Sequence, residues 1–384
     1  MRRKLLLGIT FNIALLGVVS LLTDVSGELI MPLLPIFLIT LGATPLIIGL
    51  VEGVSDCISS LLRVFSGYWS DKIGRRKPFV TAGYTNSALA RVFLPFSYAW
   101  QQVLGIRFFD RVGKGLRTAP RDALIATSAP EMHKGKAFGF HRACDTSGAI
   151  VGSLLAVLLF PLISYRGIFL IAIIPACSAA VLTLLVKEKN AAVTAPKKLD
   201  FSALSKKFKI FMIITALFSL GNFSYVFMVL RAKMFTDIVI YALLLYALFN
   251  ILYTVLAMPM GVLSDKVGRP KVLTLGYGIT TLMFLGFAFT DSFIFCIPLF
   301  LLYGLAQAVN ETVQRTFVAD LSPEELRGSA FGIYHTIVGI TALPSYLIAG
   351  ALWCYVNASA AFIFSAILIF LAFLLFSFLM REKL

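Results

Sequence analysis

The stretch GYWSDKIGRRK, residues Gly67–Lys77, places charged residues and two glycines between long apolar runs. It recurs as GVLSDKVGRPK, residues Gly261–Lys271, with 7 of 11 positions identical and an offset of 194 residues. A second pair of segments, PEMHKGKAFG at Pro130–Gly139 and PEELRGSAFG at Pro323–Gly332, shares 6 of 10 residues at an offset of 193. Two repeated blocks at nearly one offset indicate that the halves of the chain are copies of one unit.

The composition points to a lipid environment. Apolar residues make up 59% of the 384 residues and charged residues only 14%, with a mean hydropathy of +0.90. A typical soluble domain is about a quarter charged, and a water-soluble fold of this size could not bury so much apolar surface. Apolar runs of about 20 residues recur along the chain and can each cross about 30 Å of hydrocarbon. The sequence therefore predicts an all-α integral membrane protein.

Twelve spanning helices are predicted, six on each side of one long polar segment. This segment, 187–208, is interpreted as a cytoplasmic linker between an N-terminal domain, 1–186, and a C-terminal domain, 209–384. The predicted helices cover residues 8–40, 44–68, 78–97, 100–127, 135–162, 165–186, 209–233, 237–263, 271–290, 292–320, 327–352 and 355–380.

The net charge of +15 is distributed as in a membrane protein rather than as in a nucleic-acid-binding surface. Most Lys and Arg lie in loops that would share one face, which predicts cytoplasmic N- and C-termini. The alternate loops contain few basic residues; Arg166, Arg231 and Lys233 are the exceptions. The five cysteines lie singly and the three histidines are far apart, so neither a metal site nor a membrane-embedded enzyme is predicted.

The repeated stretch resembles the loop signature of the major facilitator superfamily, G-x-x-x-D-[RK]-x-G-R-[RK]-[RK]. The first copy matches it throughout, and the second copy departs only at Pro270. The run DRVGKGLRTAPRDALIA, residues 110–126, is similar to a bacterial subgroup known simply as permeases. The resemblance implies two six-helix, pseudo-symmetric domains with substrate bound near the midplane. It also implies a multi-pass protein of the bacterial inner membrane, expected to be a monomer.

Charged side chains inside the predicted helices are candidates for function, because each costs roughly 2.5 kcal/mol or more at the bilayer centre. Asp24 and Glu28 are four residues apart and therefore share one helix face. On the 100–127 helix, seven charged residues fall within an arc of roughly 140°. This stripe is expected to face the protein interior or water, and it comprises Arg107, Asp110, Arg111, Lys114, Arg117, Arg121 and Asp122.

Proton coupling is suggested by the same helices. Arg111–Gly115 resembles the superfamily motif R-x-x-Q-G, which is associated with proton coupling, although Lys114 replaces the glutamine. Burial would favour a protonated Asp24 or Glu28, whereas a nearby Arg111 would favour the charged form. No cofactor is expected, and the proton gradient is the expected driving force. Gly148 and Gly152 match half of an antiporter signature, but close helix packing explains both.

The C-terminal half has fewer charges, and its polar residues predict a hydrogen-bonding surface. Asp24 and Arg111 are predicted to face one cavity. The full set of candidate substrate- and proton-binding residues is Asp24, Glu28, Glu52, Asp56, Arg107, Arg111, Lys114, Arg117, Arg142, Asp145, Asn222, Tyr225, Asn250, Tyr253, Asn310, Glu311 and Gln314.

The excess of basic groups on the 100–127 helix favours secondary active transport of a small anionic or zwitterionic solute. Arginine suits carboxylates because its planar donors match their geometry. Two alternatives are a carboxylate siderophore and a drug or cation exported by proton antiport, with Glu52 and Asp56 among the possible cation ligands. A non-transporting receptor on the same scaffold is an alternative from another class.

The repeated loop is interpreted as a conformational latch rather than a substrate site. Gly67 and Gly74 are expected to permit a tight turn. By resemblance, Asp71 would meet the helix start near Gly328, and Asp265 the one near Gly135, where unpaired amides carry partial positive charge. The latch residues are Gly67, Asp71, Gly74, Arg75, Gly261, Asp265, Gly268 and Arg269.

Overall fold

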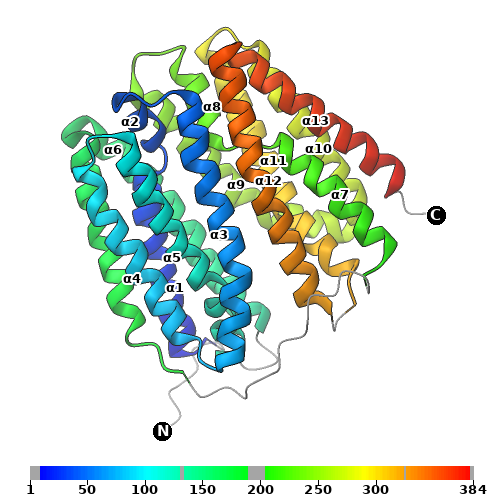
Figure 1. Cartoon of the computed structure of the whole chain (residues 1–384). Helices are drawn as coiled ribbons and strands as arrows, with labels where there is room; N and C mark the ends of the chain where they lie inside the picture. Colours follow the sequence, from blue (N-terminus) through cyan, green and yellow to red (C-terminus); the bar gives the residue numbers. More distant parts are fainter. Residues whose placement is uncertain (1–8, 130–133, 189–203, 324–325, 381–384) are drawn as a thin grey trace. The chain divides into compact units, whose positions relative to one another are not determined.

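The computed structural model describes residues 9–129, 134–188, 204–323 and 326–380. Most of the predicted linker 187–208, and both chain ends, lie outside these ranges. The chain forms two compact units: residues 1–42 with 58–196, and residues 43–57 with 197–384. Helices account for the regular structure of the described residues (Figure 1).

The described residues of the N-terminal half form six helices and one short 3₁₀ turn. They are α1 (Phe11–Ile30), α2 (Leu34–Thr40), α3 (Pro45–Ile73), α4 (Lys77–Phe93), η1 (Leu94–Phe96), α5 (Trp100–Ser128) and α6 (Lys134–Thr183). Ser164, with a φ of 58°, leaves the helical conformation and divides α6 into two helices. This division agrees with the two predicted spans 135–162 and 165–186.

Seven helices form in the part of the C-terminal half that the structure describes. They are α7 (Lys206–Gly221), α8 (Tyr225–Lys233), α9 (Val239–Val267), α10 (Arg269–Phe289), α11 (Phe293–Asp320), α12 (Arg327–Tyr355) and α13 (Ala358–Leu379). Its interior is rich in aromatic rings that pack edge to face, such as Phe223 against Phe284 and Phe362.

The first helix of each half is interrupted, where the sequence predicted continuous helices over 8–40 and 209–233. Residues 31–33 separate α1 from α2, because Pro32 and Pro35 have no N–H to donate to the preceding turn. Residues 222–224 separate α7 from α8, and the Ser224 hydroxyl caps α8 by accepting from the N–H of Val226.

The repeated loops are shorter than predicted, because α3 continues to Ile73 and α9 to Val267. The turn glycines are Gly74 and Gly268, with φ of 68° and 99°, a backbone region that glycine enters without steric cost. Gly67 is therefore not a turn residue, and the expectation that it permits the turn is wrong. It lies inside α3, where a Cβ would stand 3.2 Å from the Ala119 side chain.

Gly261 repeats this role in α9. A Cβ there would stand 3.3 Å from Thr312 of α11. In both halves the first glycine of the repeated stretch therefore allows two helices to approach closely, and the second makes the turn.

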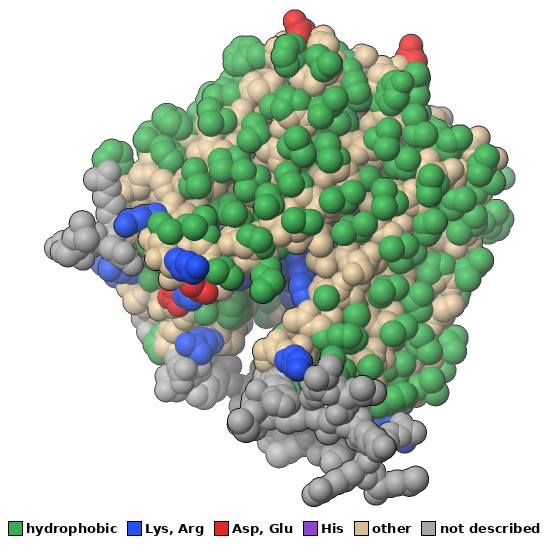
Figure 2. Space-filling model, turned by 180° about the vertical axis from the view of Figure 1, so that it is seen from behind, with side chains coloured by type: hydrophobic (Ala, Val, Ile, Leu, Met, Phe, Trp, Pro, Cys, Tyr) green, Lys and Arg blue, Asp and Glu red, His purple; other side chains and the backbone are tan. Residues whose placement is uncertain are grey.

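Nine stretches of the described chain are long and apolar enough to span a membrane. One of them contains both parts of α6, and the charged α5 and the shorter α4 bring the number of crossing helices to twelve. Large apolar side chains such as Leu162, Met258 and Phe289 are exposed. Figure 2 shows such side chains spread over the surface, as contact with lipid requires.

The orientation of the chain can be tested with single cysteines in a cysteine-free variant. Lys72→Cys, at the end of α3, is expected to resist a membrane-impermeant maleimide added outside intact cells, because the basic loops are predicted to face the cytoplasm. Asp291→Cys, between α10 and α11, is expected to react. External labelling of Lys72→Cys alone would reverse the predicted topology.

Candidate functional site

The charged stripe of α5 lies inside the first unit, as its helical period predicts. Glycines make this possible, because a Cβ at Gly113 would stand 2.5 Å from the carbonyl oxygen of Gly83 on α4. The backbones of α4 and α5 are therefore in direct contact. Ser87 Oγ of α4 then donates to the carbonyl oxygen of Asp110 at 2.9 Å, which brings polar atoms of α4 to the charged side of α5.

Asp110 is the central anion of this cluster. Its carboxylate forms ion pairs with Arg107 at 3.3 Å and with Arg91 of α4 at 3.5 Å. Arg91 also donates to the carbonyl oxygen of Thr23 on α1 at 3.0 Å. All three charged side chains are buried. One carboxylate thus connects two arginines, and through them three helices.

Arg111 and Arg117 extend the cluster along α5, and both are buried. The guanidinium of Arg111 lies 3.9 Å from the Met31 sulfur, and that of Arg107 lies 3.7 Å from the same atom. Two arginines therefore point toward the break between α1 and α2. Arg117 donates to Ser87 Oγ at 2.5 Å and lies over the ring of Tyr84.

A second group of charges lies between α1 and α6, which are in extensive contact. Cβ atoms at Gly148 and Gly152 would stand 3.1 Å and 2.8 Å from the Cβ atoms of Asp24 and Glu28. These two glycines thus place the α1 carboxylates at the α6 backbone. This accounts for both glycines by helix packing.

Asp24 interacts electrostatically with Glu28, Lys114, Arg121 and Asp145. The guanidinium of Arg111 lies near the sulfur of Met31, which directly follows α1. Lys114 of the 111–115 motif is among the cations that interact with Asp24. That Asp24 and Arg111 face one cavity stays a prediction. Arg142 of α6 is exposed.

The second unit contains the predicted hydrogen-bonding residues. The amide of Asn310 donates to Thr280 Oγ1 at 2.9 Å. Gln314 donates to the hydroxyl of Tyr277 at 3.2 Å and accepts from that of Tyr334 at 2.9 Å. These bonds join α10, α11 and α12.

Other predicted residues of the second unit occupy separate places. Glu311 accepts from the Tyr253 hydroxyl at 2.9 Å, which joins α9 and α11. Asp56 accepts from the Tyr346 hydroxyl at 2.9 Å. Glu52 and Asn250 are buried, Asn222 caps the end of α7, and the ring of Tyr225 packs on Tyr246.

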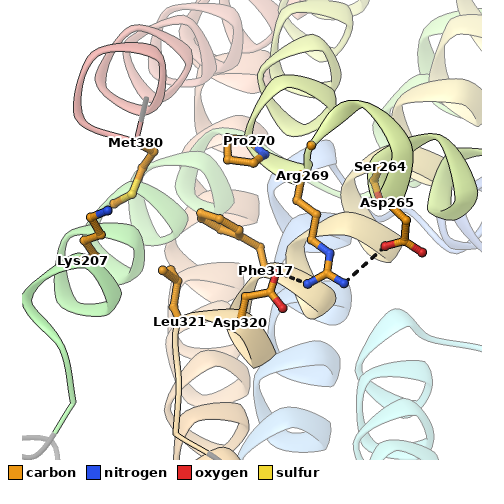
Figure 3. Close-up of a pocket in the computed structure, with 10 residues that line it drawn as sticks. Lys207, Ser264, Asp265, Arg269, Pro270, Phe317, Asp320, Leu321 and Met380 are labelled. Carbon is orange, nitrogen blue, oxygen red and sulfur yellow. Dashed lines mark hydrogen bonds and ion pairs between the residues drawn. The ribbon is translucent and has the colours of Figure 1, made fainter. Parts of the chain in front are cut away.

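The two repeated loops differ in their ion pairs. Asp71 pairs with Arg76 at 3.0 Å, but Pro270 stands at the equivalent of Arg76. In the second copy, Asp265 pairs with Arg269 at 3.3 Å, and Arg269 also pairs with Asp320 of α11. Figure 3 shows Arg269 between the two carboxylates. Arg75, the counterpart of Arg269, is exposed.

The second loop borders a pocket of about 330 Å³ that Lys207, Phe317 and Met380 help to line. The pocket is lined by one lysine, one arginine and two aspartates. Their charges balance, so the pocket does not favour a ligand of either sign. The predicted latch contacts of Asp71 and Asp265 would join the two units, and they stay predictions.

Sequence reasoning missed several partners in these clusters. The charged side chains contact the hydroxyl of Ser20, the carbonyl oxygen of Thr23, the sulfur of Met31 and the ring of Tyr84. Small or apolar residues in a spanning helix carry no signal of their own, so only the packing of α1 and α4 on α5 reveals them. Among the described residues, no cluster of His, Cys, Asp and Glu suits a metal ion.

The similarity to known proteins extends over nearly the whole chain. The family model described as Major Facilitator Superfamily matches residues 16–237 and 236–383. An uncharacterized MFS-type transporter of Methanocaldococcus jannaschii is 42% identical over 380 residues, covering 96% of this chain and 94% of that protein. A POT family transporter solved in complex with 5-aminolevulinic acid has the same fold, with a TM-score of 0.83, 12% identity and 96% of each chain covered.

Two more distant relatives have named roles. The cis,cis-muconate transport protein of Acinetobacter baylyi is 28% identical, covering 70% of this chain and 69% of that protein. The multidrug resistance protein MdtG of Proteus mirabilis is 24% identical, covering 91% of this chain and 90% of that protein.

Proposed function

This chain belongs to the major facilitator superfamily, and from that premise we propose that it is a proton-coupled secondary transporter of a small carboxylate or zwitterion. In such transporters the two halves alternate access to a central site. The proposed location is the bacterial inner membrane with cytoplasmic termini. The protein is proposed to act as a monomer without a cofactor.

The buried arginine cluster carries this proposal. On α4 and α5, Arg91, Arg107, Arg111 and Arg117 are all buried, and Asp110 is the only buried carboxylate of these two helices. Lys114 of α5 is a fifth cation. Asp24 and Glu28 of α1 are two further anions. Five cations against three anions leave a positive site.

A carboxylate solute fits this excess of positive charge. Arginine binds carboxylates through two parallel N–H donors. The relative named as a muconate transporter supports this class, because muconate is a dicarboxylate.

Cation or drug efflux by proton antiport is the second candidate. Glu52 is buried in α3 and Asp56, one turn away, accepts from Tyr346. These carboxylates could bind a cation, and the relative named as a multidrug resistance protein supports this class. The two candidates place the substrate against opposite charges, so they can be separated by experiment.

Counterflow in proteoliposomes tests the proposal. The purified full chain, in vesicles loaded with unlabelled cis,cis-muconate, is expected to accumulate labelled muconate transiently without any imposed gradient, because a transporter exchanges its substrate across the membrane. Empty vesicles and vesicles loaded with ethidium are the controls. A panel of 5-aminolevulinate, dicarboxylates and tricarboxylates then defines the class.

Three results would contradict the proposal in different ways. Exchange of ethidium but of no carboxylate would favour the efflux candidate. Thermal stabilisation by a carboxylate without exchange would favour a receptor. No exchange of any acid in the panel would remove the carboxylate class.

A further inference from the structure

We propose that the transported proton binds between α1 and α6, on Asp145 and His141 together with Asp24, and not on the arginine cluster of α5. This inference rests on the proposed proton coupling and assigns its site. Asp145 and His141 have no part in the substrate proposal, which counts Asp24 only among the nearby anions.

Asp145 is the centre of this site. One carboxylate oxygen accepts a hydrogen bond from the Ser20 hydroxyl of α1. The other lies 3.7 Å from Nδ1 of His141, one turn earlier on α6. His141 is buried, and its Nε2 has no hydrogen-bond partner among the described residues. An imidazole next to a carboxylate is an arrangement suited to proton transfer.

Asp24 provides the second carboxylate and interacts electrostatically with Asp145. Two nearby carboxylates disfavour double ionisation, so a proton on one of them is stabilised. Gly148 determines their separation, because a Cβ there would stand 2.5 Å from the carbonyl oxygen of Leu21. Any movement of α1 along α6 would therefore change the interaction between the two acids.

The surrounding charges connect this site to α5. Arg121 donates to Ser20 Oγ at 3.5 Å and pairs with Asp122 at 2.9 Å. The charged and titratable groups that face the site are Asp24 and Glu28 of α1, Tyr84 of α4, Lys114, Arg121 and Asp122 of α5, and His141, Arg142 and Asp145 of α6. One bound proton raises the net charge of the group by one, whether it neutralises an aspartate or charges the histidine.

The arginine cluster is less suited to this role. Asp110 pairs with two arginines, which favour its charged form and oppose protonation. Asp145 has a hydroxyl, an imidazole and a second carboxylate as neighbours, and Arg121, the nearby cation, forms its ion pair with Asp122.

A substrate-free experiment tests the site on the purified full chain. Infrared difference spectra recorded across a pH titration are expected to show the carbonyl band of a protonated carboxylic acid in the wild type. Asp145→Asn should lose this band or shift its midpoint, and His141→Gln should shift the midpoint. His335→Gln in α12 and the exposed Asp237→Asn are matched controls and should leave the band unchanged.

Transport provides the second readout, with cis,cis-muconate as the probe. Asp145→Asn and His141→Gln are expected to lose accumulation driven by an imposed pH gradient and to retain counterflow, which also shows that they fold. Asp145→Glu should restore part of the gradient-driven uptake.

The outcomes separate the two proposals. If both variants keep the wild-type band and gradient-driven uptake, the proton site is wrong. If the wild type carries no muconate but its carboxylic band disappears in Asp145→Asn, the substrate class fails and the proton site stands.

Discussion

Asp110→Asn is expected to destabilise the protein by roughly 3–5 kcal/mol, because it removes one partner of a buried ion-pair cluster and leaves the other charges uncompensated. Arg91 and Arg107 would lose their shared carboxylate. Asparagine keeps the shape of the side chain, so the loss would report charge rather than packing. The free energy of unfolding from denaturant titration in detergent micelles measures it.

A double-mutant cycle identifies the cause of this loss. Asp110→Asn combined with Arg107→Gln should be less destabilising than the sum of the single changes, since the second removes an uncompensated charge. Asp237→Asn is the control, because Asp237 is exposed and its pair with Lys233 is at the surface, where such pairs contribute roughly 0–1 kcal/mol. A wild-type free energy of unfolding for Asp110→Asn would show that the cluster is not a stabilising unit.

The sequence predicted the helices well because apolar length and loop charge are local signals. The stripe of α5 was also predictable, since the helical period determines which residues share a face. The breaks at residues 31–33 and 222–224 were harder, because proline and asparagine also occur within continuous spanning helices. Gly67 was misinterpreted because a glycine beside a turn and a glycine at a helix contact look the same in a sequence.

Partners within the site were beyond sequence reasoning. Arg91 lies near a predicted helix end and is not among the predicted site residues, yet it connects Asp110 to the α1 backbone. Which side chains of α5 face α1 depends on the rotation of α5 about its axis. That rotation follows from the contact of Gly113 with Gly83, a pair of glycines 30 residues apart whose contact only the packing of α4 on α5 reveals.

The second large effect is expected at Arg111. Arg111→Gln should weaken carboxylate binding by roughly 2–5 kcal/mol, the usual cost of truncating one partner of a buried charge pair. This corresponds to a rise in Kd of roughly 30-fold to several thousand-fold. Isothermal titration of the purified chain with cis,cis-muconate, or with the best acid of the counterflow panel, measures it.

Arg111→Lys distinguishes charge from geometry at this position. A lysine keeps the positive charge but loses the planar pair of donors, so its affinity should fall between wild type and Arg111→Gln. Arg166→Gln is the matched control, since Arg166 donates to the carbonyl oxygen of Ser97 and lies over the Tyr98 ring, away from the cluster. If Arg111→Gln and Arg166→Gln bound the acid equally well, Arg111 would not contact the substrate, and Arg107, which shares the Met31 contact, would be the next arginine to test.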